Sequence, residues 1–181
     1  PPRSTLFPYT TLFRSGGNNT LPMKDLAAVL EGLGLQGVAT YIQSGNVVFQ
    51  GKAVDPALLS KKIAVAIGKS HGFEPWVRLL EMPMLEAVIR GNPYPEAEDA
   101  PGTLYVNFLA RVPPQPDLDG LEKRRAASER FQLAGDVLYL HAPDGIGRSK
   151  LAAALEQLLG VPVTSRNWNT VRKLGEMARA A

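Results

Sequence analysis

The chain has 181 residues, 45% of them hydrophobic, a formal net charge of +3 and no cysteine. This length suits one domain or two small ones, and the absence of cysteine excludes a disulfide framework, a thiolate nucleophile and a zinc–thiolate site. The sequence contains no apolar run of membrane-spanning length and no signal-peptide pattern, so we expect a cytoplasmic protein.

The first fifteen residues differ in character from the rest. They contain Arg3 and Arg14 but no acidic residue, so only +1 of the net charge remains from Gly16 onward. The repeated Thr-Leu-Phe in this stretch resembles translated sequencing-adapter sequence. We therefore interpret residues 1–15 as a non-native or irregular N-terminal segment. Basicity is then weak evidence for nucleic-acid binding.

Residues 16–91 are predicted to form a first α/β unit. In chain order we expect a helix from Pro22 to Leu33, a β-hairpin over about 38–50, a helix that starts at Asp55 and Pro56, and a strand at 76–80. With a strand before residue 16 the order would be β-α-β-β-α-β, which is the ferredoxin-like arrangement. Residues 6–7 and 11–13 are β-prone, but their alternation does not demand a strand, so the first strand stays open.

Residues 92–102, rich in proline, glycine and acids, are predicted to be a linker, and residues 103–181 a second unit. Its expected elements are a strand at 104–110, a helix at 118–129, a hairpin at 130–141, a helix after Ser149, an extended piece at 161–164 and a last helix from Trp168. The sequence thus predicts an α+β protein of two ferredoxin-like units packed together, plus a C-terminal helix.

Several separated motifs occur in the order found in the bacterial domain-of-unknown-function family numbered 1697, which residues 16–178 resemble. The motifs are Gly16-Gly17-Asn18-Asn19, Leu21-Pro22-Met23, residues 40–49, Asn92-Pro93-Tyr94, residues 145–151 and residues 164–170. The resemblance implies a two-unit α+β fold and no established activity. Family members usually carry Arg-Gly-Ile-Asn-Val before the first motif, whereas Arg14-Ser15 stands here, so this chain departs from the family pattern at that point.

Two predicted helix starts could bind an anion through free N–H groups and the helix dipole. The first consists of Gly16, Gly17, Asn18 and Asn19, and the second of Arg148, Ser149 and Lys150 after a Gly-x-Gly turn. The alternative is structural: asparagines that cap a tight turn, and Ser149 as the N-cap of its helix.

A third candidate site is the polar cluster Arg166, Asn167, Trp168 and Asn169. The arginine could bind a phosphate or carboxylate, the indole could stack on a base, and Asn169 could contact the edge of the base. In the alternative, the asparagines cap the last helix, Trp168 packs inward and Arg166 forms a carboxylate pair. Ser44 and Asn46, in the first hairpin turn, are predicted either to face the first helix start or only to form the turn.

Catalysis has little support. His71 and His141 have no neighbouring Ser or Asp pattern that indicates a triad. The acids Glu96, Glu98 and Asp99 lie in the expected linker and are interpreted as solvated. We predict no catalytic residue, no metal site and no cofactor.

The function favoured by the sequence is a non-catalytic binding module for a small phosphorylated ligand or nucleotide. One alternative is an enzyme that acts on a phosphate-bearing substrate without a metal or histidine centre. Nucleic-acid binding is less favoured because the charge is low, and a structural role or a homodimer remains open because ferredoxin-like sheets expose edges that can pair.

Overall fold

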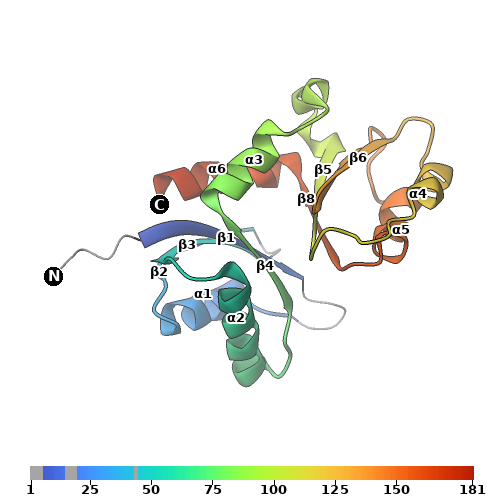
Figure 1. The fold of residues 1–181 in the computed structure, drawn as a ribbon. Helices are drawn as coiled ribbons and strands as arrows, with labels where there is room; N and C mark the ends of the chain where they lie inside the picture. The colour runs from blue at the N-terminus through green and yellow to red at the C-terminus, as the bar shows by residue number, and fades with distance from the viewer. Residues whose placement is uncertain (1–5, 15–19, 43–44) are drawn as a thin grey trace. The chain divides into compact units, whose positions relative to one another are not determined.

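The structure is a computed structural model that describes residues 6–14, 20–42 and 45–181 (Figure 1). They form two four-stranded antiparallel sheets, each with helices, which confirms the prediction of an α+β protein with two ferredoxin-like units. One unit extends to Ala87 and also includes Lys173–Ala181, and the other is Val88–Arg172. The C-terminal residues, which we had assigned to the second unit, thus belong to the first.

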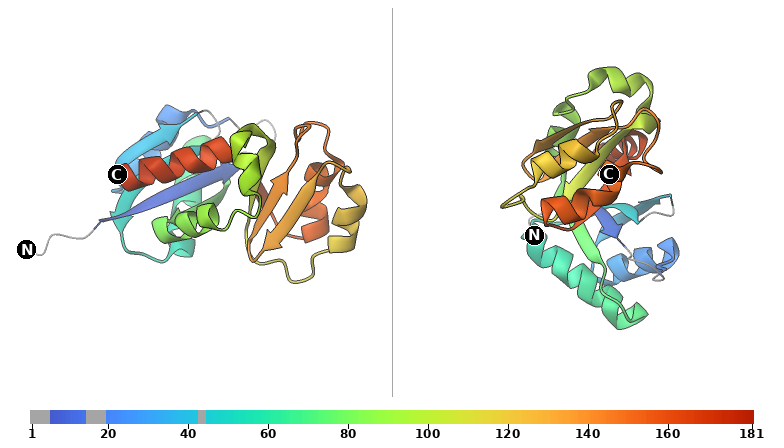
Figure 2. Two further views of the ribbon diagram at one scale, coloured as in Figure 1. Left: turned by 90° about the horizontal axis from the view of Figure 1, so that it is seen from above. Right: turned by 90° about the vertical axis from the view of Figure 1, so that its right-hand side faces the viewer.

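The first sheet has the strand order β2-β3-β1-β4. Its strands are β1 (Leu6–Arg14), β2 (Gln36–Tyr41), β3 (Asn46–Lys52) and β4 (Trp76–Glu81). Helices α1 (Met23–Gly32) and α2 (Pro56–His71) lie on one face of this sheet (Figures 1 and 2), and α3 (Met82–Arg90) follows β4. Buried side chains from these strands and helices form the core: Tyr9, Leu26, Leu30, Val47, Phe49, Leu59, Ile63, Ile67, Val77 and Leu79.

Strand β1 lies at the centre of the first sheet. It pairs with β3 on one side and β4 on the other, and the Tyr9 ring stacks on Phe49 with 5.6 Å between ring centroids. A strand here satisfies the backbone hydrogen-bonding groups of both neighbours, which would otherwise lack partners. Residues 6–14, where the first strand had been left open, are therefore an integral strand and not an irregular arm.

The second sheet has the order β6-β7-β5-β8. Its strands are β5 (Leu104–Leu109), β6 (Arg130–Ala134), β7 (Val137–His141) and β8 (Val163–Asn167). Helices α4 (Leu118–Arg124) and α5 (Lys150–Leu159) accompany it on one face (Figure 2, left). Two short 3-10 helices, η1 (Pro95–Asp99) and η2 (Pro101–Thr103), occupy the expected linker, and α6 (Trp168–Ala180) follows β8.

Alternation along the strands divides the second sheet into two faces. Leu138 and Leu140 belong to the same buried cluster as Leu151 of α5, so they point toward that helix. Successive side chains of a strand point to opposite faces, and Tyr139 and His141 therefore point away from α5. The opposite face is also covered, because the Tyr139 hydroxyl donates to the Val88 carbonyl at 2.7 Å. Burial raises the pKa of this tyrosine to about 12.

Two glycines near α5, Gly147 and Gly160, differ in backbone conformation. Gly160 ends the helix in a left-handed conformation with φ 67°, whereas Gly147 has no positive φ, and an added Cβ would meet open space at either position. We expect Gly160→Ala to lower the free energy of unfolding by about 1 kcal/mol, because an L side chain disfavours that conformation. Gly147→Ala should leave it unchanged or raise it by about 0.5 kcal/mol. Urea unfolding measures both, and equal losses would contradict the assignment.

Candidate functional site

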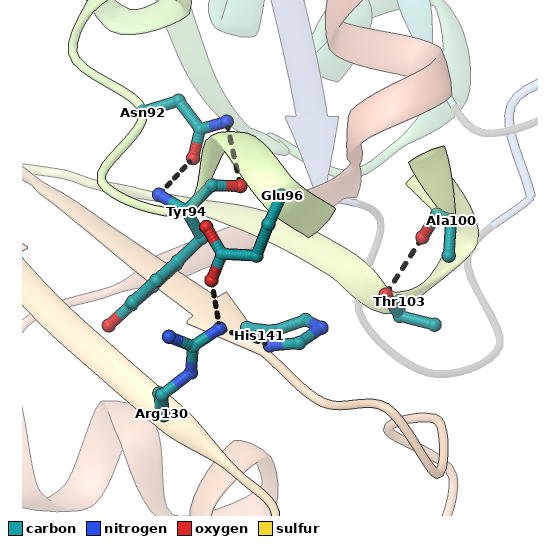
Figure 3. A network of polar contacts seen from close by, with 7 residues as sticks. All are labelled: Asn92, Tyr94, Glu96, Ala100, Thr103, Arg130 and His141. Atoms are coloured by element: carbon teal, nitrogen blue, oxygen red, sulfur yellow. Dashed lines mark hydrogen bonds and ion pairs between the residues drawn. The ribbon is translucent and has the colours of Figure 1, made fainter. Parts of the chain in front are cut away.

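The segment that had been predicted as a linker contains a turn organised by Asn92. Its Oδ1 accepts a hydrogen bond from the Tyr94 N–H at 2.9 Å, and its Nδ2 donates to the Tyr94 carbonyl at 3.3 Å and to Glu98 Oε1 at 2.8 Å. Asparagine commonly forms such bonds to the backbone two residues on, and Pro93 and Pro95 each favour an extended conformation for the residue before them. The turn leads into η1 and positions Tyr94 and Glu96 beside the β6–β7 hairpin (Figure 3).

Arg130 is the centre of a cluster with Tyr94, Glu96 and His141 (Figure 3). Arg130 opens β6 and pairs in register with His141, the last residue of β7. Its Nη2 donates to His141 Nδ1 at 3.0 Å and forms an ion pair with Glu96. The guanidinium carbon lies 4.6 Å from the centroid of the Tyr94 ring, within the range of a cation–π interaction.

The charges of this cluster follow from its contacts. Because a guanidinium only donates, His141 Nδ1 must accept, which places the ring proton on Nε2. Burial, together with the charge of Arg130, lowers the pKa of His141, and the nearby carboxylate of Glu96 opposes this effect. The hydrogen bond from Arg130 lowers the pKa of Glu96, and burial raises that of Tyr94. At neutral pH the cluster thus consists of one cation, one anion and two neutral rings.

The predicted cations Arg148 and Lys150 flank the start of α5, and both are exposed. Between them, Ser149 Oγ accepts a hydrogen bond from the Ala152 N–H at 3.0 Å, which is an N-cap. The serine therefore has the structural role that we had considered as the alternative to anion binding.

Arg166 lies apart from α5. Val163 belongs to the buried cluster that includes α5, so the alternation of β8 turns Arg166 to the other face, together with Thr164. Its Nη1 donates to Thr164 Oγ1 and to the Ser165 carbonyl, both at 2.8 Å. Burial lowers the pKa of this guanidinium to about 10. The structure therefore does not bring Arg166 and the α5 cations to one face of the sheet.

The other residues of the third predicted site surround the start of α6. Asn167 Oδ1 accepts from the Thr170 N–H at 2.9 Å and so caps the helix. Trp168 is fully buried, its Nε1 has no hydrogen-bond partner within the described part of the chain, and Asn169 is exposed. An indole in this position packs inward and offers no exposed face on which a base could stack.

The candidate residues of the first half lie largely outside the described chain. Gly16, Gly17, Asn18, Asn19 and Ser44 are not among the described residues. Asn46 is buried, and its Nδ2 donates to the Tyr41 carbonyl at 3.2 Å, which ties the two strands of the hairpin together.

His71 has neighbours that the sequence analysis did not foresee. Ser70 Oγ lies 2.7 Å from its Nδ1, and Asp25 Oδ2 lies 3.3 Å from its Nε2. The hydroxyl also lies 3.1 Å from the Ala66 carbonyl, within the last turn of α2. The carbonyl-rich end of a helix disfavours an oxyanion. The Ser70 hydroxyl is therefore poorly placed for nucleophilic catalysis. The contact between Asp25 and His71 links α1 to α2.

Metal-ligand and membrane-spanning features are absent from the described residues. Residues 6–14, 20–42 and 45–181 contain no group of three or more His, Cys, Asp or Glu side chains placed to hold a metal ion. None of the helices in these ranges is long and apolar enough to cross a bilayer.

The fold defines an α+β protein of two ferredoxin-like units. The chain belongs to the family described as "Protein of unknown function (DUF1697)", whose model matches residues 9–139. It is similar to the solved structure of conserved bacterial protein SP0830 from Streptococcus pneumoniae, with 26% sequence identity and a TM-score of 0.66. The similarity covers 96% of this chain and 99% of that one. Comparison with curated proteins gives no match.

The lowered pKa of His141 predicts a pH dependence of stability. Its folded-state pKa lies below the ordinary value of 6.5, so the unfolded chain gains a proton first as the pH falls through that value, and stability falls with it. The corresponding loss through Glu96 begins lower, below 4.5. Between pH 7.5 and 5, wild type should lose more free energy of unfolding than His141→Gln, measured by urea unfolding. Equal losses in both proteins would contradict a neutral His141.

Proposed function

We propose that this protein is a non-catalytic binding module for a small phosphorylated ligand or nucleotide, with Arg130 as the residue that holds the phosphate. The observation that carries the proposal is that Arg130 is oriented and yet accessible. Its side chain is 48% exposed, and both its hydrogen bond to His141 and its ion pair with Glu96 use Nη2. Within the described residues, Nε and Nη1 have no hydrogen-bond partner, and they retain three N–H donors.

Such a guanidinium suits a phosphate for two physical reasons. Each of its two forks pairs Nη2 with Nε or Nη1, so a phosphate that takes the place of Glu96 at Nη2 can accept from two donors at once, in charge-assisted hydrogen bonds about twice as strong as neutral ones. It is also held by the Tyr94 ring and by His141, so less side-chain entropy is lost when a ligand binds. The His141 ring, half-buried and 6.1 Å from the buried Tyr94 ring between centroids, provides an aromatic surface next to which a nucleotide base could lie.

Glu96 occupies the position of a competing oxyanion. Its lowered pKa supports the view that Arg130 stabilises negative charge at this point. A phosphate, with more charge and more acceptor oxygens, would displace the exposed carboxylate or share the guanidinium with it.

A thermal-melt series with inorganic phosphate and AMP tests the proposal. A ligand at a hundred times its dissociation constant stabilises the folded state by about 2.7 kcal/mol, which shifts the melting temperature measurably. We expect this shift for wild type and for Arg124→Gln, an exposed control on α4, and its loss in Arg130→Gln. Arg148→Gln distinguishes binding at the start of α5 from binding at the Arg130 cluster, and it should keep the shift. An unchanged shift in Arg130→Gln would overturn the assignment, and turnover of AMP would favour the enzyme alternative.

Removal of the competing carboxylate gives the opposite prediction. Glu96→Gln keeps the shape of the side chain but removes its negative charge, so phosphate should bind several-fold more tightly than to wild type. Isothermal titration measures the difference. Weaker binding to Glu96→Gln would mean that the carboxylate supports the ligand through the position of Arg130 instead of competing with it.

A further inference from the structure

The first unit contains a groove beside α2 that takes no part in the proposed phosphate site. A hollow of about 340 Å³ lies where the end of α1, the end of β3 and the start of α2 meet. A second, more open hollow of about 620 Å³ adjoins it and shares Leu33, Leu58 and Lys62 with the first. Together they form one groove, which runs along α2 as far as Lys69.

The floor of the groove is apolar and exposed. Leu33, Val54 and Leu58 keep 39%, 41% and 50% of their surface in contact with solvent. Leu33 is the C-cap residue of α1, Val54 precedes Asp55, the N-cap of α2, and Leu58 lies in the first turn of α2. The three side chains meet because the end of α1 and the start of α2 line the same hollow. Apolar side chains exposed singly are normal on a protein surface, whereas here three line one hollow, which makes the hollow a candidate interaction surface.

The rim of the groove carries one sign of charge. Lys52 and Lys62 line the first hollow, Lys61 and Lys69 join Lys62 in the second, and neither set of lining residues includes an acid. Within the described chain, none of these four lysines forms an ion pair. The carboxylate of Asp55, next to Val54, is already used, because its Oδ1 accepts a hydrogen bond from the Ala57 N–H at 2.9 Å. The groove therefore favours an occupant with negative charge.

The length of the groove favours a helix. Leu58, Lys62, Val65 and Lys69 follow one another at helical spacing along the exposed side of α2. At 1.5 Å per residue, the eleven steps from Leu58 to Lys69 span about 16 Å, which is three turns of a helix that lies alongside. A small ligand is normally enclosed over most of its surface, which two open hollows do not provide.

We propose that this groove binds an acidic amphipathic helix of a partner protein, whose apolar side chains contact Leu33, Val54 and Leu58 and whose carboxylates face the lysines. Binding of an amphipathic helix in an apolar groove is a recurring mode of peptide recognition, with anchors at i, i+3 or i+4 and i+7. Because this surface belongs to the first unit and accepts a different ligand, the proposal does not depend on the phosphate site of the second unit.

Selection from a library of random 16-residue displayed peptides, with the full chain as the target, tests the proposal. We expect enriched peptides to carry apolar residues at i, i+3 or i+4 and i+7 and to be rich in Asp and Glu. Their synthetic forms should bind Leu58→Glu and Lys62→Glu at least tenfold more weakly in fluorescence anisotropy, and all variants should retain the wild-type melting temperature. Val112→Glu and Lys123→Glu, exposed residues of the second unit, are the matched controls and should bind as wild type does.

Two outcomes would overturn the proposal. In the first, no peptide is enriched, or the enriched peptides bind Leu58→Glu and Lys62→Glu as tightly as wild type. In the second, the chain sediments with phosphatidylglycerol vesicles, and both Leu58→Glu and Lys62→Glu abolish this sedimentation, while no peptide binds. The groove would then contact an anionic lipid surface in place of a protein.

Discussion

The register between β6 and β7 determines which side chains of the second unit can meet. It places Arg130 opposite His141 on the face that points away from α5. Because side chains alternate along a strand, a slip of one residue would move Arg130 to the α5 face and break the cluster with Tyr94 and Glu96. The same alternation separates Arg166 from the start of α5. Arg166 and the cations at the start of α5, all candidates from the second half of the chain, thus lie on different faces of the sheet. Arg130 and Glu96, which are 34 residues apart in the sequence, instead form an ion pair.

The elements that could be predicted from the sequence depend on local chemistry. Asp55 followed by Pro56 predicted the start of α2, and the structure confirms it, since the side chain caps the Ala57 N–H. Both hairpins formed where two β-prone runs flank a glycine turn, as at Gly135 with φ 62°. The same order of elements in each half led to two ferredoxin-like units, which the two sheets confirm.

The features that sequence reasoning missed depend on contacts between distant residues. Strand β1 was left open because its alternation is weak, and it forms because β3 and β4 both offer it hydrogen-bonding partners. Residues 92–102 were predicted to be a linker, and they contain the turn held by Asn92 and two 3-10 helices. The helix predicted over 118–129 ends at Arg124. The contact between His71 and Asp25 joins residues 46 positions apart, which no local pattern reveals.

The NMR spectrum of the arginine Nε–H groups, recorded while inorganic phosphate is added to the wild-type protein, tests the phosphate site at Arg130 directly. We expect a saturable shift of the Arg130 Nε–H signal and of the ring signals of His141, because phosphate would take the place of Glu96 on the fork that Nε and Nη2 form. A spectrum in which Arg130 stays unchanged, while Arg148 or no arginine responds, would contradict the claim that the β6–β7 register builds an anion site.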